Sequence, residues 1–210
     1  DLDNLPANNA AGIEGDHYVY TDVDLTTLGQ VHHTDLTIKG NTKVDGIIGN
    51  EAVGGVFGGG DMSPVNGNAS VSIINTDSSN GINNVFGGGN TADVLGNDTV
   101  SVVAGTMKDV YGGGRGSSTT VNGKVIVNIG KKINSAGDVV SSGTPVIMGD
   151  VYGGSALGAV NASTTKDADG NITAYTATEG MTTQVGIYAG SITGSVFGGG
   201  LGHDDEENSD

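Results

Sequence analysis

The five residues Val110-Tyr111-Gly112-Gly113-Gly114 decide the fold, because this pattern of valine, aromatic residue and glycines occurs five times in the chain. Five of the nine aromatic residues, six tyrosines and three phenylalanines in all, stand at its second position. Such internal repetition indicates a repeat architecture and not a Gly-rich disordered segment. The other four copies are Val56-Phe57-Gly58-Gly59-Gly60, Val85-Phe86-Gly87-Gly88-Gly89, Val151-Tyr152-Gly153-Gly154-Ser155 and Val196-Phe197-Gly198-Gly199-Gly200.

The repetition continues on the C-terminal side of the motif. A valine follows the motif aromatic by eight positions at Val65, Val94 and Val160, and by ten at Val121. An alternating apolar segment then begins six residues after this valine in the first three copies. These segments are Val71-Ser72-Ile73, Val100-Ser101-Val102 and Val127-Asn128-Ile129, with Val185-Gly186-Ile187 as the late equivalent. Apolar residues that alternate at period two predict strands, and helix patterns are nearly absent.

Successive motif aromatics, at positions 57, 86, 111, 152 and 197, are 29, 25, 41 and 45 residues apart. One coil of a three-sided parallel solenoid, with three short strands and three turns, needs about as many residues as the shorter periods. The sequence therefore predicts an all-β fold, a parallel β-helix (β-solenoid) of about six coils. We expect it to be right-handed, since parallel crossovers nearly always are.

The repeats divide the chain into three predicted parts. Residues 1–46 form an N-terminal atypical coil or cap, residues 47–203 form the β-solenoid repeats, and residues 204–210 form an acidic tail. The two long periods indicate insertions near residues 130–146 and 161–183, which leave one face of the stack as loops or hairpins.

The residue types of the motif suggest how it packs. Equivalent residues of successive coils stack, so we expect the valine to point into a narrow core and the ring to lie outward or at a corner. Glycine accepts positive φ and permits close approach of backbone, and thus marks a repeated corner. The glycines do not form a phosphate-binding loop, because no Gly-x-x-x-x-Gly-Lys-Ser/Thr pattern is present.

Composition excludes several classes of function. The formal net charge is −16, with 8 basic and 24 acidic residues, so nucleic acids and anionic membrane surfaces are unfavourable partners. No apolar run reaches the length of a membrane span, so membrane insertion is not expected. The chain has no cysteine, which excludes disulfides and thiolate metal sites.

The segments Val94–Val102, Ile147–Ser155 and Ile192–Gly200 carry a resemblance. Their pattern, Ile-x-Gly-Asp-Val-Tyr-Gly-Gly-Gly followed by Val-x-Gly-x-x-x-Val-x-Ile, resembles the repeat regions of large adhesin-like surface proteins of gut and oral anaerobic bacteria. The resemblance covers residues 47–200 and departs at Ser155 and after Val160. It implies a non-enzymatic, parallel β-helical segment with an extracellular or cell-surface location, and it transfers no catalytic residue.

Two carboxylates are the candidate site. Asp109 and Asp150 directly precede motif valines, so stacked coils place them near each other on one face. Paired carboxylates of this kind suit a Ca²⁺ ion or the acid–base pair of a glycosidase. The alternative is a solvated charged face with Lys108 nearby. No other cofactor is expected.

Two further groups of polar residues have structural interpretations. His32 and His33 are neighbours in a predicted strand and point to opposite faces, so they do not share one metal ion. Asn-x-Ser/Thr triplets begin at Asn68, Asn97, Asn161 and Asn171, and they indicate exposed positions.

Three functions remain open. The favoured one is a rigid extracellular stalk, adhesin segment or self-stacking filament subunit, whose partners are other copies of itself or adjoining repeats end to end. The second is a module that binds a glycan or host ligand through the insertions, with Tyr175 and Tyr188 as aromatic platforms. The third is a β-helical polysaccharide-degrading enzyme using Asp109 and Asp150, against which the single arginine, Arg115, and the few lysines argue.

Overall fold

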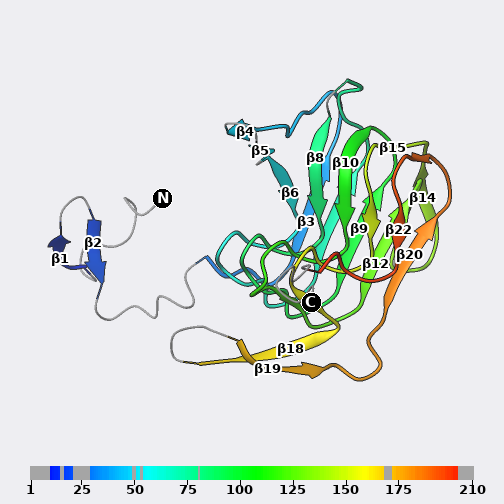
Figure 1. Ribbon diagram of the computed structural model, residues 1–210. Coiled ribbons are helices and arrows are strands. Elements are labelled where there is room, and N and C mark those ends of the chain that lie inside the picture. Colours follow the sequence, from blue (N-terminus) through cyan, green and yellow to red (C-terminus); the bar gives the residue numbers. More distant parts are fainter. Residues whose placement is uncertain are drawn as a thin grey trace, which may run out of the picture.

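The computed structural model describes residues 10–14, 17–20, 29–48, 51–52, 54–79, 81–167 and 172–202. Within these ranges the protein is all-β, with no residue in a helix, and its larger sheets are parallel (Figure 1). The predicted acidic tail, residues 204–210, lies outside the described residues.

Five parallel strands form the sheet that we call sheet one, in the order β20-β12-β9-β7-β3. Its strands pair without a register shift, so that equivalent residues of the sequence repeat lie next to each other. The alternating segments that follow the motifs are therefore the strands β7, β9, β12 and β20. The bounds are β3 (Thr34–Ile38), β7 (Ala69–Ile73), β9 (Asp98–Val102), β12 (Val125–Ile129) and β20 (Thr183–Ile187).

The motifs themselves form a second parallel sheet, sheet two. All five copies align in register, valine beside valine and ring beside ring. The longest strand, β10, pairs with β15 through its first residues and with β16 through its last. The bounds are β6 (Gly55–Phe57), β8 (Ile82–Phe86), β10 (Thr106–Tyr111), β15 (Val146–Ile147), β16 (Val151–Tyr152), β21 (Ser191–Ile192) and β22 (Val196–Phe197).

Val31 and the valines that follow the first four motifs form a third set of parallel pairings, the valine ladder. It consists of bridges between single residues and of the pair β11 (Thr120–Val121) and β17 (Ala159–Val160). The longer spacing before Val121 leaves the pairing intact, so the two extra residues are absorbed in the preceding turn. In order, the ladder contains Val31, Val65, Val94, Val121 and Val160.

The chain visits the valine ladder, sheet one and sheet two in this order five times between Val31 and Phe197. The sequence predicts about six such circuits, because it counts the stretch before the first motif separately. That stretch instead begins the first circuit: β3 lies in sheet one, Val44 bridges to Ile82 of sheet two, and β6 follows.

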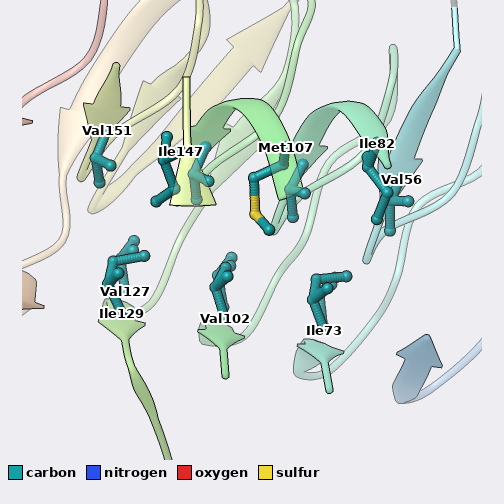
Figure 2. Close-up of a cluster of buried hydrophobic side chains, with 13 residues drawn as sticks. Val56, Ile73, Ile82, Val102, Met107, Val127, Ile129, Ile147 and Val151 are labelled. Carbon is teal, nitrogen blue, oxygen red and sulfur yellow. The ribbon is translucent and has the colours of Figure 1, made fainter. Parts of the chain in front are cut away.

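The core lies between sheets one and two. Figure 2 shows two rows of side chains that point toward each other, one from each sheet. All of them are buried, and burying a valine or isoleucine side chain contributes about 1.5–3 kcal/mol. The row from sheet two contains Val56, Ile82, Met107, Ile147 and Val151, and the row from sheet one contains Ile73, Val102, Val127 and Ile129.

The motif rings form a continuous stack outside this core. Centroids of neighbouring rings lie 4.8, 4.8, 4.9 and 5.0 Å apart from Phe57 to Phe197, and the rings are nearly parallel. The three inner rings, of Phe86, Tyr111 and Tyr152, are buried against each other and Ala156. Stacking on both faces buries these rings although they point away from the valines.

The motif glycines are required by close approach between circuits. None of them has a left-handed φ, so the positive φ that the sequence suggests is not their reason. The N–H of Gly112 donates to the carbonyl of Tyr152 (2.9 Å), and a Cβ on Gly112 would collide with the carbonyl oxygen of Gly153. Ser155 replaces the third glycine of its motif, and its hydroxyl accepts a hydrogen bond from the N–H of Gly114 (3.1 Å).

Antiparallel hairpins interrupt the circuits. Two lie within the ranges where the sequence predicts insertions: β13 (Lys131–Ile133) with β14 (Val139–Ser142), and β18 (Ala162–Lys166) with β19 (Ile172–Ala177). The β18–β19 hairpin extends away from the sheets (Figure 1), and an ion pair joins its Lys166 Nζ to Asp93 Oδ2 at 2.8 Å. The other antiparallel pairs are β1 (Ala10–Glu14) with β2 (His17–Tyr20) and β4 (Ile47–Ile48) with β5 (Glu51–Ala52).

Candidate functional site

Asp109 and Asp150 lie next to each other in neighbouring circuits, directly before the paired valines of β10 and β16. Their carboxylates accept hydrogen bonds from the backbone of the following circuit. The N–H of Asp150 donates to Asp109 Oδ1 (2.8 Å), and the N–H of Ser195 donates to Asp150 Oδ1 (2.6 Å). Each carboxylate therefore accepts a hydrogen bond from the backbone N–H group directly before a short strand of the next circuit. Side-chain oxygens often bond backbone groups in this way where the chain forms a turn.

The second oxygens of these carboxylates also have partners. Lys108 Nζ lies 3.5 Å from Asp109 Oδ2, and the hydroxyl of Tyr152 donates to Asp150 Oδ2 (3.0 Å). Burial, together with the charge of Asp109, raises the pKa of Tyr111 to about 12. Among the described residues, no group of three or more His, Asp and Glu side chains is arranged to hold a metal ion. The geometry of Asp109 and Asp150 thus fits stacking of circuits.

A second ladder of acceptors runs along the turn before sheet one. Nδ1 of His33 accepts from the N–H of Asn68 (2.8 Å), Oδ1 of Asn68 from the N–H of Asn97 (2.9 Å), and Oδ1 of Asn97 from the N–H of Lys124 (2.8 Å). His32 and His33 precede β3 and do not lie in a strand, and their ring centroids are only 4.1 Å apart, so the prediction that they point to opposite faces is wrong. His33 and two of the Asn-x-Ser/Thr asparagines therefore act as structural acceptors.

Asn161 begins another of these triplets and is also engaged in packing. It is the only non-glycine residue of the described ranges with a left-handed φ (56°). Its Nδ2 donates to the carbonyl of Gly123 (2.8 Å), and its Oδ1 accepts from Thr183 Oγ1 (2.8 Å). Asn161 thus fixes the point where the β18–β19 hairpin leaves the circuit. Asn171, the fourth such asparagine, lies outside the described residues.

Asp98 is a buried carboxyl group to which no repeated position of the sequence points. It is fully buried at the start of β9, between Ala69 and Val125 of the neighbouring strands. Neither carboxyl oxygen has a hydrogen-bond partner, and burial raises the pKa well above the ordinary value of 3.8. Burial in this apolar corner therefore favours the neutral, protonated form of the carboxyl group.

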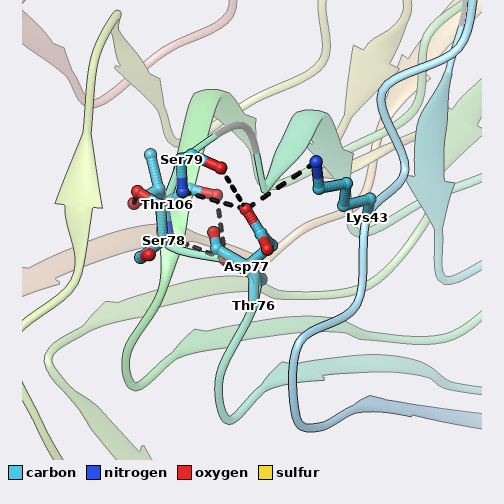
Figure 3. Close-up of polar contacts among 6 residues, drawn as sticks. All are labelled: Lys43, Thr76, Asp77, Ser78, Ser79 and Thr106. Atoms are coloured by element: carbon cyan, nitrogen blue, oxygen red, sulfur yellow. Dashed lines mark hydrogen bonds and ion pairs between the residues drawn. The ribbon is translucent and has the colours of Figure 1, made fainter.

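Polar side chains join the turn after β7 to the next circuit (Figure 3). The N–H of Thr106 donates to Thr76 Oγ1 (2.8 Å), and Thr76 Oγ1 donates to the carbonyl of Thr106 (3.1 Å). Beside them, Asp77 Oδ1 accepts from the N–H and hydroxyl of Ser79 and lies 3.9 Å from Lys43 Nζ. These contacts hold the turn between the sheets.

A groove of about 670 Å³ lies on the outer face of sheet one, beside the β13–β14 hairpin. Ser72, Ser101 and Asn128 are among the residues that line it, and Tyr188 stands at the edge formed by β20. Tyr175, the other candidate platform, is exposed on β19 and does not line this groove. The sequence suggests the insertions as a binding surface, but the direction in which each hairpin folds decides which one forms a groove.

The last circuit has an unpaired outer edge among the described residues. Val196 and Phe197 are 46% and 44% exposed, whereas the equivalent Val110 and Tyr111 are buried. A Cβ placed on Gly198 or Gly199 would meet nothing within 4 Å. The last circuit therefore has the same motif residues as an inner circuit. In inner circuits these residues pack against the following circuit, which the described residues do not provide here.

The comparisons with known proteins provide no relative from which a function could be transferred. None of the described residues belongs to a helix with the length and apolarity of a membrane span. No protein-family model, curated protein or solved structure matches the chain.

Proposed function

We propose that this chain is a right-handed β-solenoid that serves as a non-enzymatic structural module of an extracellular or cell-surface stalk, adhesin or filament. The solenoid is supported by five passages through the valine ladder, sheet one and sheet two in constant order and register. Continuous backbone pairing along one axis makes such a stack a stiff rod. The location and the adhesin context depend on the resemblance of the repeats.

The open edge of the last circuit carries the proposal. In inner circuits, Gly58, Gly87, Gly112 and Gly153 lack a side chain because the carbonyl of the next circuit occupies its place. Gly198 keeps this glycine where no described atom is near, although glycine carries an entropic cost. A further circuit with the same motif would fill this place, from a second copy or from adjoining repeats. Unpaired strand edges favour such additions.

Electron microscopy of the purified chain over a concentration series tests the proposal. We expect filaments of uniform width that lengthen with concentration. Gly198→Ala should abolish them, because the added methyl group occupies the place of the stacked carbonyl. Ser117→Ala, a change in an exposed lateral turn, serves as the matched control and should not. Single particles at every concentration would contradict stacking between copies.

The candidate roles of Asp109 and Asp150 need a separate test. Because both carboxylates already accept hydrogen bonds, we propose that neither binds Ca²⁺ nor takes part in catalysis. Calorimetric titration with Ca²⁺ should give no binding heat, and EDTA should leave the melting temperature unchanged. Ca²⁺ binding that the double variant Asp109→Asn/Asp150→Asn abolishes would contradict this part of the proposal.

A further inference from the structure

The groove on sheet one is formed where the chain turns back over its own sheet. Gly130 ends β12 with a left-handed φ of 88°, and β13 then packs against β9. The hairpin therefore stands over the outer face of sheet one and forms one wall of the groove. Its volume of about 670 Å³ lies within the range of small-ligand sites, roughly 300–1,000 Å³.

The floor of the groove is made of polar side chains in register. Ser72, Ser101 and Asn128 follow each other on β7, β9 and β12, at a strand spacing of about 4.8 Å. They are only 2%, 2% and 5% exposed, yet they line the groove and make no side-chain hydrogen bond to the described residues. Where this row reaches the groove, its hydroxyl and amide groups offer donors and acceptors for a ligand.

A fixed aromatic ring closes one end of this row. A Cβ on Gly186 would lie 2.7 Å from the hydroxyl oxygen and 2.8 Å from two ring carbons of Tyr188, so this side chain crosses the sheet over the glycine. Lys131 Nζ lies 3.9 Å from the ring centroid on the hairpin side. The Tyr188 ring therefore has a defined position beside Asn128. It requires a glycine at position 186 of β20, the residue that pairs with Asn128 of β12.

We propose that this groove binds an extended, neutral oligosaccharide. Sugar rings carry hydroxyl groups on their edges and C–H groups on their faces, which match the serine–asparagine row and the apolar Ile126 and Ile133 of the lining. The five strands of sheet one span about 19 Å, long enough for several sugar units in a row. A polyanionic chain is disfavoured because the protein has a formal net charge of −16.

A glycan array that includes cello-, chito- and malto-oligosaccharides tests this proposal. The free oligosaccharide with the strongest signal is then titrated into the full chain by calorimetry. We expect Tyr188→Ala to weaken its binding at least about tenfold. Tyr175→Ala, which removes a tyrosine that is also exposed (57% against 46% for Tyr188) from the β18–β19 hairpin, should bind as the unchanged protein does.

A second variant keeps the test independent of local folding. Gln184 lines the groove from β20 and is exposed, so Gln184→Ala should weaken binding while circular dichroism stays unchanged. The proposal is overturned if no neutral glycan binds, if only anionic glycans or peptides bind, or if both groove variants bind as tightly as Tyr175→Ala. Filament formation is measured separately, so these outcomes leave the structural proposal intact.

Discussion

Gly112 and Gly198 occupy the same position of the repeat, but only at Gly112 does a described circuit lie where the added Cβ would point. Gly112→Ala should lower the free energy of unfolding by about 1–3 kcal/mol or more, because its methyl group needs the place of the Gly153 carbonyl. Gly198→Ala should change it by less than about 0.5 kcal/mol. Guanidinium denaturation at low protein concentration measures both, and equal losses would contradict the inferred difference.

Asp98 should make the stability of the protein depend on pH. Burial raises its folded-state pKa well above 3.8, whereas unfolding returns the carboxyl to water. The folded state thus binds the proton more tightly, and this stabilisation is fully present below about pH 3.8 and is lost as the pH rises through the folded-state pKa. Asp98→Asn should remove this slope and raise the free energy of unfolding near pH 8 by about 1–3 kcal/mol.

Urea denaturation at several values between about pH 4 and about pH 8 measures this slope. Asp138→Asn is the matched control, because Asp138 is exposed in the β13–β14 hairpin, and its curve should follow that of the unchanged protein. Parallel pH curves for Asp98→Asn and the unchanged protein would show that Asp98 is not the titrating group.

The sequence predicts some residues much better than others for a physical reason. The motif valines can be placed inside because five copies repeat the same choice. Asp98 stands where the other strands carry Thr34, Ala69, Val125 and Thr183, so repetition provides no guide to it. Only the three-dimensional register shows that this carboxyl group is enclosed by apolar neighbours.

Among the elements, the stack of rings contributes most at its centre. Tyr111 stacks on two rings, at 4.8 and 4.9 Å, whereas Phe197 stacks on one and is 44% exposed. Tyr111→Ala should therefore cost about 3–5 kcal/mol of unfolding free energy. Phe197→Ala should cost much less. Thermal and chemical denaturation measure the loss of unfolding free energy in both variants. Similar losses would mean that each ring contributes independently of its stacked neighbours.

The hairpins show the limit of prediction at this scale. The long periods of 41 and 45 residues locate both insertions, because the repeat resumes in register after each. Nothing in the sequence indicates that β13 folds back onto β9 while β18–β19 extends outward, since this direction depends on the turn at Gly130 and the ion pair of Lys166. For this reason the sequence does not predict the groove.

For the whole molecule, the net charge opposes self-association, whereas the open edge of the last circuit favours it. Copies with a formal charge of −16 repel each other, whereas the edge of the last circuit offers backbone groups and the outer face of the Phe197 ring, against which no described residue stacks. Salt weakens the repulsion and leaves the edge unchanged. The Debye length falls from about 30 Å at 0.01 M to about 8 Å at 0.15 M, less than two strand spacings.

We therefore expect self-association to strengthen with salt, which sedimentation velocity measures at a fixed protein concentration. Gly198→Ala should remain a single species at both ionic strengths, because salt does not remove the collision of its methyl group with a stacked carbonyl. Association that weakens with salt would instead mean that ion pairs hold the copies together. Association of Gly198→Ala equal to that of the unchanged protein would place the contact elsewhere, because circuits that stack on this edge need glycine at that position.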